Sequence, residues 1–365
     1  MKTYRVLQFG MTYNPGGIES FIMNYYRHID RQKIQFDFVN MYDEIAYENE
    51  INLLGGKVYN ITSFRSNPVK NYLEIRKIIK NNKYDIIHVN MLSMAYITPI
   101  LVAKDLGVKK IIAHSHNSSM PPNLFKKILH KVNQIFFNKY ITQFCACSKD
   151  AGKWMFGDSV LEENIHIINN AVDTLHFTYN EIKREEIRLK LGINDKFVIG
   201  NVARFDYQKN HNFLIDIFFE VQQENENAIL LLVGDGPLRK SIEEKVAKLS
   251  IQDKVIFLGV REDIADLMQV MDVFLLPSYF EGLAVVLIEA QASGLITICS
   301  DSIPNEVNVS NSVEFLKLEL GSRYWAKLIN NLEGKYCRYD ICKKTNLSNF
   351  NIKEQVTVLE KIYTE

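Results

Sequence analysis

Residues 273–294 read VFLLPSYFEGLAVVLIEAQASG and contain, in order, an apolar strand, a polar break and a helix. The run from Val273 to Leu276 is continuously apolar, which is typical of a parallel strand covered on both faces. Pro277 and Gly282 interrupt the pattern before the helical spacing begins. Glu281 is therefore expected in the loop beyond the strand's carboxyl end, where open α/β sheets bind their ligands.

The start of this helix predicts a binding site for an anion. Free backbone N–H groups and the positive end of the helix dipole are expected at Gly282, Leu283, Ala284 and Val285. Glu289 follows about two turns later, where its carboxylate can accept hydrogen bonds from hydroxyl groups. A nucleotide sugar, with a diphosphate and several hydroxyl groups, suits this pattern. The spacing alone also allows an ordinary amphipathic helix with solvated glutamates.

The same alternation of strand and helix extends through most of the chain. The expected strands are residues 5–9, 36–39, 57–60, 86–89, 110–113 and 143–148, and then 197–203, 228–233, 255–258, 273–276 and 295–299. Such alternation predicts an α/β fold with parallel, doubly wound sheets. Since 365 residues exceed the usual size of one hydrophobic core, we expect two Rossmann-like domains facing a cleft. The pattern pauses near residue 170, so the domains are expected at 1–170 and 171–349.

Further candidate residues follow other predicted strands. Gly16 and Gly17 lie between a strand and a helix, where glycines let backbone N–H groups approach a phosphate, although most such pairs are simply turns. Arg204 and Lys209 follow the strand at 197–203 and suit a diphosphate, unless they are solvated surface charges. His116 is expected at the carboxyl edge of the first sheet, as a site residue or a structural one.

The composition limits the cellular setting. The formal charge is zero, but residues 1–170 hold 21 Lys and Arg against 14 Asp and Glu, which suggests an anionic partner for the first half. No apolar run approaches the roughly 20 residues of a membrane span, and no signal peptide is evident. The five cysteines are scattered and suit buried thiols in a reducing compartment. We predict a cytoplasmic protein with no nucleic-acid partner.

Residues 123–140 form a basic amphipathic pattern with two interpretations. Such a helix can lie on an anionic membrane surface, with its apolar residues in the lipid and its lysines near the headgroups. Alternatively, the apolar face packs on the core and the basic face is solvated. We favour the second interpretation from the sequence, because it describes most amphipathic helices.

With these residues assembled, the chain resembles the retaining glycosyltransferases of family 4, which have the GT-B fold, over nearly its full length. The matching segments are Gly16 to Glu19, His114 to Asn117, Asn169 to Asp173, Arg204 with Lys209 and Asn210, Leu232 to Leu238, and Glu281 to Glu289. The chain is most similar to the bacterial branch that builds capsular and exopolysaccharide repeat units. It departs from the family at Ala284 and after Gly294, where the family often has proline.

The resemblance implies how the donor diphosphate is held. Arg204 and Lys209 would neutralise it, and Gly16 or Gly17 would offer it a backbone N–H group. A UDP-sugar is the expected donor. No Asp-x-Asp placed to hold a divalent ion is evident, so we expect neither a cofactor nor an obligatory metal. The resemblance also implies that residues 350–365 cross back to the first domain.

The resemblance assigns the remaining site residues to the sugar and the nucleoside. Glu281, with the backbone after Gly282, would bind hydroxyl groups of the donor sugar, and His116 would contact that sugar from the other domain. Glu289 would bind the ribose hydroxyls. Arg261 lies where the family's base pocket forms.

The expected reaction transfers a sugar, with retention at the anomeric carbon, to a hydroxyl group of a glycan or lipid-linked glycan in bacterial surface polysaccharide synthesis. A lipid-diphosphate-linked acceptor would place the protein peripherally on the inner face of the plasma membrane. A sugar-nucleotide epimerase of the same fold and a non-catalytic nucleotide-sugar sensor are the alternatives. The sequence leaves open the base, the sugar and the acceptor.

Overall fold

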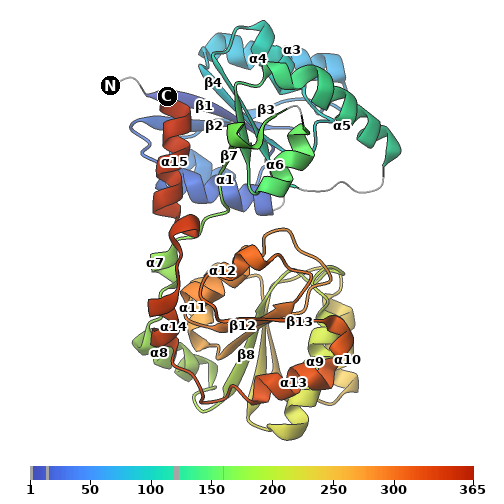
Figure 1. The fold of residues 1–365 in the computed structure, drawn as a ribbon, viewed down its shortest axis with the longest axis vertical. Helices are drawn as coiled ribbons and strands as arrows, with labels where there is room; N and C mark the ends of the chain where they lie inside the picture. Colours follow the sequence, from blue (N-terminus) through green and yellow to red (C-terminus); the bar gives the residue numbers. More distant parts are fainter. Residues whose placement is uncertain (1–2, 14–15, 118–122, 159) are drawn as a thin grey trace. The chain divides into compact units, whose positions relative to one another are not determined.

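The computed structural model describes residues 3–13, 16–117, 123–158 and 160–365 (Figure 1). The chain divides into two compact units. The first comprises residues 1–171 and 349–365, and the second comprises residues 172–348. Each unit is an α/β layer structure built on one parallel sheet, and each is described here by itself.

The first unit contains a parallel sheet of seven strands in the order β3-β2-β1-β4-β5-β6-β7. The strands are β1 (Tyr4–Phe9), β2 (Ile34–Asn40), β3 (Val58–Asn60), β4 (Ile86–Met91), β5 (Lys110–Ser115), β6 (Gln143–Ala146) and β7 (Ile165–Ile167). The helices are α1 (Gly17–His28), α2 (Glu48–Leu53), α3 (Pro68–Asn82), α4 (Thr98–Asp105), α5 (Leu124–Phe137), α6 (Lys149–Phe156) and α15 (Ile352–Thr364).

Helices cover both faces of this sheet. Because side chains alternate along a strand, Val6 and Leu7 of β1 point into different cores. Val6 packs in the core that includes α1 and α15, and Leu7 in the core that includes α3, α4 and α6. This arrangement explains why apolar residues occupy both faces of the strands rather than every second position.

The last helix, α15, belongs to the first unit. It lies beside α1, and its Ile352, Val356 and Tyr363 are buried in the same core (Figure 1). The ammonium group of Lys110 also donates hydrogen bonds to the carbonyl oxygens of Ile362 and Tyr363, at 2.7 and 3.1 Å. The end of the chain is therefore part of the core of the unit that contains its beginning.

The second unit contains a parallel sheet of six strands in the order β10-β9-β8-β11-β12-β13. The strands are β8 (Phe197–Val202), β9 (Ala228–Val233), β10 (Val255–Gly259), β11 (Val273–Leu276), β12 (Ile296–Ser300) and β13 (Val313–Leu316). The helices are α7 (Thr174–Phe177), α8 (Glu181–Leu191), α9 (His211–Glu224), α10 (Arg239–Lys248), α11 (Ile264–Val270), α12 (Val285–Ala292), α13 (Ser322–Asn330) and α14 (Arg338–Lys344).

The predicted fold class, two doubly wound parallel sheets, is confirmed, but several elements were missed. β7 and β13 have only three and four residues, so their apolar patterns are short. No helix was expected between the pause near residue 170 and the strand at 197–203, where the structure has α8. The one buried residue of this helix is Arg188, and its apolar contact with the core is limited to the partly buried Ile187 and Leu191, so its helical apolar pattern is weak.

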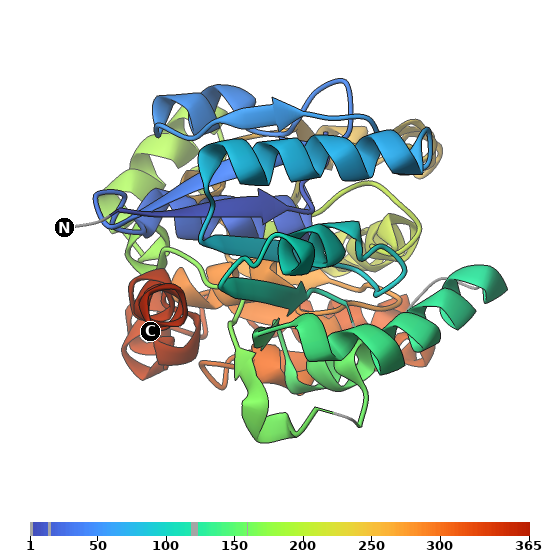
Figure 2. The same ribbon diagram turned by 90° about the horizontal axis from the view of Figure 1, so that it is seen from above.

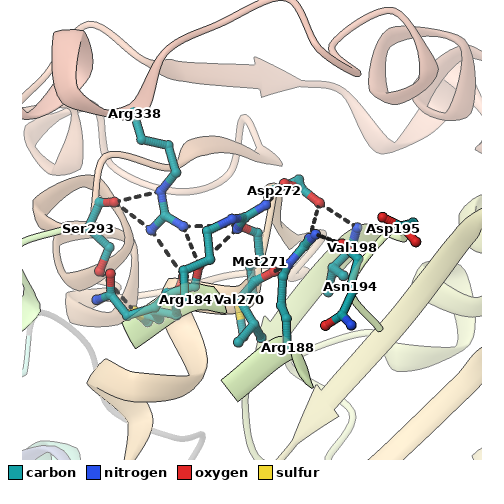
Figure 3. Close-up of polar contacts among 12 residues, drawn as sticks. Arg184, Arg188, Asn194, Asp195, Val198, Val270, Met271, Asp272, Ser293 and Arg338 are labelled. Carbon is teal, nitrogen blue, oxygen red and sulfur yellow. Dashed lines mark hydrogen bonds and ion pairs between the residues drawn. The ribbon is translucent and has the colours of Figure 1, made fainter. Parts of the chain in front are cut away.

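Arginines add to the limited apolar contact that holds α8 to the second unit (Figure 3). Arg184 and Arg188 both pair with Asp272, at 2.5 and 2.6 Å. Arg188 also donates to the carbonyl of Val270, and Arg338 of α14 donates to that of Ser293. Since α11 and α12 end at these carbonyls, the guanidinium groups satisfy acceptors that the helices leave unpaired.

Candidate active site

Two loops at the carboxyl ends of neighbouring strands form the centre of the candidate site. Residues 203–210 follow β8, and residues 277–284 follow β11. The Tyr279 N–H donates to the Gln208 carbonyl at 2.8 Å, and the side-chain amide of Gln208 donates to the Phe280 carbonyl at 2.9 Å. The rings of Tyr207 and Tyr279 stack at 4.7 Å. The two loops are therefore held together and form one continuous surface.

Lys209 and Glu281 meet where these loops join. The Lys209 Nζ lies 2.6 Å from Glu281 Oε1, which also accepts from the Ser278 hydroxyl at 2.7 Å. The second carboxylate oxygen accepts from Gln208 at 3.0 Å. Only 6% of the Glu281 side chain is exposed, so this ion pair is largely shielded from water. The structure thus joins a residue predicted to bind the diphosphate and one predicted to bind the sugar.

Arg204 occupies the start of the first loop and is exposed. Within the described parts of the chain, its guanidinium group forms no hydrogen bond or ion pair. The next residue, Phe205, is buried and stacks on His211 at 4.1 Å. The backbone of Phe205 also passes so close to Gly236 that a Cβ there would lie 2.5 Å from its carbonyl oxygen. The arginine therefore extends from a firmly packed backbone.

The N-terminus of α12 lies beside Glu281. Gly282 is exposed, with open space where a side chain would begin, and Leu283 and Ala284 lead into the first helical residue, Val285. This geometry suits the approach of an anion to the helix start, as the sequence predicts.

Glu289 lies one turn further along α12, and burial raises the pKa of its carboxyl group to about 7. Among the described residues, this carboxyl group forms no hydrogen bond or ion pair. Glu289 is only partly buried, and a carboxylate acceptor without a partner at this position favours a ligand that brings hydroxyl groups.

The first unit carries the remaining predicted residues except Arg261. Gly16 precedes the first residue of α1, which is Gly17, and both are exposed. The loop before them is held by Glu19, whose carboxylate accepts from the backbone N–H and hydroxyl group of Thr12, at 2.8 and 2.9 Å. Residues 14 and 15 of this loop lie outside the described residues.

His116 directly follows β5 and is held on two sides. Its Nε2 lies 2.9 Å from Asn90 Oδ1, and its ring stacks on that of His114 at 4.2 Å. Phe21 of α1 presents its ring to both histidines, at centroid distances of 4.8 Å. Burial lowers the pKa of His116 to about 3, so the imidazole is neutral at physiological pH.

Arg261, the candidate for the base pocket, lies in the loop after β10 and is exposed. Its guanidinium group pairs with Asp263 two residues later, at 2.8 and 2.6 Å. Exposed pairs of this kind are weak, so a ligand can replace the contact at little cost. Its proposed role stays a prediction.

The sequence analysis missed the residues that orient the candidates. Ser278 and Gln208 orient Glu281, Asn90 contacts His116, and Glu19 holds the first loop. Ser278 lies three residues before Glu281 and could have been found from this spacing. Asn90 is contributed by a different strand, and the sequence carries no signal for its contact.

Helix α5 has an unusual orientation. Six of its large apolar side chains are exposed, with fractions from 42 to 75%, namely Leu124, Phe125, Ile128, Val132, Ile135 and Phe136. Lys126, Lys127 and Lys131 are exposed with them. Figure 2 shows the N-terminal end of α5 projecting from the rest of the first unit. The expectation that this helix packs its apolar face on the core was therefore wrong.

Polar side chains attach α5 to the protein instead. Asn133 donates to the carbonyl of Met94 at 2.6 Å, and His130 accepts from the N–H group of the same residue at 3.0 Å. Gln134 donates to the carbonyls of Trp154 and Met155. These hydrogen bonds compensate the burial of the polar face, so the apolar face remains available.

Two family models match the chain. The model described as Glycosyltransferase Family 4 matches residues 15–175, and the model described as Glycosyl transferases group 1 matches residues 183–317. EpsF of Bacillus subtilis, a protein named as a glycosyltransferase, is 38% identical over 336 residues, which cover 89% of this chain and 86% of that protein. The chain belongs to glycosyltransferase family 4.

Two further similarities bear on this glycosyltransferase. An Escherichia coli enzyme named UDP-Gal:alpha-D-GlcNAc-diphosphoundecaprenol alpha-1,3-galactosyltransferase is 26% identical over 317 residues, covering 81% of this chain and 79% of that one. The structure of Anabaena HepE in complex with UDP and glucose superposes with a TM-score of 0.72 at 19% identity, covering 99% of this chain and 95% of that chain. The structural similarity shows that the fold is GT-B.

The described residues contain neither a candidate metal site nor a candidate membrane span. No group of three or more His, Cys, Asp or Glu residues in that part of the chain could hold a metal ion. Likewise, none of the helices that the structure describes is long and apolar enough to cross a membrane.

Proposed function

We propose that this glycosyltransferase moves a sugar from a UDP-sugar to a hydroxyl group of a lipid-linked glycan, with retention at the anomeric carbon, in bacterial surface polysaccharide synthesis. The observation that carries the proposal is the cluster of Lys209, Glu281 and Ser278 beside the start of α12. In this cluster, Lys209 supplies a cation that can bind a phosphate, and Glu281 supplies a carboxylate that can bind sugar hydroxyl groups. The E. coli relative, named for a UDP-Gal donor and a diphosphoundecaprenol acceptor, and the HepE complex with UDP support the choice of UDP and of a lipid diphosphate.

The chemistry follows from charge placement. When the bond between the anomeric carbon and the diphosphate breaks, negative charge grows on the departing oxygen. Arg204, Lys209 and the N–H groups at the start of α12 would stabilise that charge by preorganised electrostatics. The acceptor oxygen bonds to the same face of the sugar, and its proton passes to the departing phosphate. Glu281 would bind sugar hydroxyls while its other contacts keep it fixed.

The experiment is a transfer assay with R204A and K209A, after UDP-, GDP- and other sugar donors are screened for thermal stabilisation. Both variants should lose mainly kcat, by about a hundredfold, because their contacts strengthen as the leaving group gains charge. K240A changes an exposed lysine of α10 and is the matched control. Undiminished kcat in both variants would exclude the role. Conversion of the donor without acceptor would indicate an epimerase, and binding without turnover would indicate a sensor.

We also propose that α5 binds the anionic inner face of the plasma membrane, where a lipid-linked acceptor resides. The exposed apolar side chains would enter the headgroup region, and the neighbouring lysines would pair with anionic lipids. Helix α5 is attached to the protein by its polar face, so its apolar face is exposed. Exposure of an apolar patch to water is unfavourable in free energy, and such a patch suits a lipid surface.

Liposome flotation tests this contact. Replacing both Phe125 and Ile128 with serine should reduce binding to vesicles that contain anionic phospholipid by about a hundredfold or more, because each removed side chain contributes roughly 1.5 to 3 kcal/mol when buried. L53S changes a leucine of α2 that is 87% exposed in the same unit, and it should bind like the unmodified protein. Equal flotation of all three proteins, or indifference to anionic lipid, would contradict the proposal.

A further inference from the structure

A chain of buried hydrogen bonds extends from His116 to the last helix. It contains Gln8 of β1, His88 and Asn90 of β4, His114 of β5 and Tyr363 of α15, all of them at most 5% exposed. The bonds join His116 Nε2 to Asn90 Oδ1 (2.9 Å), Asn90 Nδ2 to Gln8 Oε1 (3.1 Å), Gln8 Nε2 to Tyr363 Oη (3.2 Å), Tyr363 Oη to His88 Nδ1 (2.6 Å) and His88 Nε2 to His114 Nδ1 (3.1 Å).

One backbone carbonyl fixes the direction of this chain. Asn90 Nδ2 lies 3.0 Å from the carbonyl oxygen of Phe9, which can only accept. The amide nitrogen of Asn90 must therefore face Phe9, and its amide oxygen must face His116. Since that oxygen is also only an acceptor, the hydrogen of the neutral His116 ring lies on Nε2. The other ring nitrogen, Nδ1, then carries a lone pair.

The directions of the remaining hydrogen bonds, as far as His114, follow from that of Asn90. Gln8 accepts from Asn90 through Oε1, so its nitrogen donates to Tyr363. The single hydroxyl hydrogen of Tyr363 then goes to Nδ1 of His88, which donates through Nε2 to His114. Burial lowers the pKa of His88 to about 3, which keeps this ring neutral as well. The network thus defines one tautomer for each ring.

We propose that Asn90 is a positioning residue for sugar transfer: it holds His116 as the Nε2–H tautomer, so that Nδ1 accepts a hydrogen bond from a hydroxyl group of the transferred sugar. The inference rests on the proposed function and on the contact of His116 with the donor sugar that the family resemblance implies. Asn90 is itself held firmly, because a Cβ at Gly10 would lie 2.3 Å from its carbonyl oxygen and the two backbones are in contact. A neutral acceptor recognises a hydroxyl group and does not act as a general acid.

Long-range proton–nitrogen NMR of the histidine rings tests the tautomer directly. In the unmodified protein, Nδ1 of His116 should have the shift of an unprotonated ring nitrogen, and Nε2 that of a protonated one. In N90D the carboxylate cannot donate to Phe9 and should favour a protonated His116 at neutral pH. We expect kcat/KM for the UDP-sugar to fall about ten- to a hundredfold, with the affinity for UDP alone unchanged.

The matched control is N40D. Asn40 is also a buried asparagine at the carboxyl end of a strand of this sheet, and it bonds to Asn60 and Tyr42 rather than to His116. N40D should keep the tautomer and stay within about twofold of the unmodified kcat/KM. The role of Asn90 would be overturned by a hydrogen on Nδ1 of His116 in an active enzyme, or by a folded N90D with the same kcat/KM as the unmodified protein. Neither result would affect the proposed function. Absence of any sugar transfer by the unmodified protein would overturn the proposed function, and the role of Asn90 with it.

Discussion

Replacing Glu289 with glutamine should stabilise the second unit by an amount that increases with pH. Burial raises the pKa of this carboxyl group from 4.5 to about 7. Between pH 4.5 and about pH 7, the carboxyl group of Glu289 is protonated to a greater extent in the folded protein than in the unfolded chain. Stability of the unmodified protein therefore falls as pH rises through this window and levels off above about pH 7. This shift in the pKa of Glu289 corresponds to a loss of about 3 kcal/mol in the free energy of unfolding at high pH.

The measurement is the free energy of unfolding in urea, followed by tryptophan fluorescence at several pH values. Trp325 is fully buried in α13 of the second unit, so a W154F background restricts the signal to that unit. E289Q should match its parent near pH 4.5 and exceed it by about 3 kcal/mol above pH 7. E314Q, which changes an exposed carboxyl group of β13, is the control. A difference between E289Q and its parent that does not vary with pH would refute the reasoning.

The other predictions concern the packing and charge of the second unit. K209M should cost about 2 kcal/mol of unfolding free energy by leaving the buried Glu281 without its partner, and K209M/E281Q should recover most of it; additive losses in this cycle would contradict the pairing. D272N should cost about 3 kcal/mol in urea unfolding because two arginines lose their carboxylate, and an unchanged midpoint would argue against that role. G200A should lower the Tm by several degrees, since its Cβ would lie 2.0 Å from Met271 Sδ; a Tm equal to the parent's would show that this contact relaxes freely.

Much of the fold could be predicted because its signals are local. The apolar run of β11 and the breaks at Pro277 and Gly282 identify a strand and a helix from neighbouring residues alone. Since the carboxyl ends of parallel strands share one edge of a sheet, Lys209 and Glu281 were expected on the same side of the second unit. Their contact, across 72 residues of sequence, required the three-dimensional structure.

The orientation of α5 could not be predicted from local sequence patterns. Periodicity groups its apolar residues on one face, but it does not say whether that face meets the core or the solvent. The choice depends on partners elsewhere in the chain, here backbone groups of Met94 and Trp154 that bond to its polar face. These partners are visible only after folding.

The sequence by itself determined two parallel sheets, the family, and which residues lie at the ends of strands, because each of these depends on short-range spacing. The tertiary structure alone decided the environment of those residues. Tyr363 meets Gln8 across 355 positions, and burial in the folded second unit raises the pKa of Glu289. Burial and long-range hydrogen bonds, which set the charge and direction of a functional group, arise only when separate parts of the chain pack together.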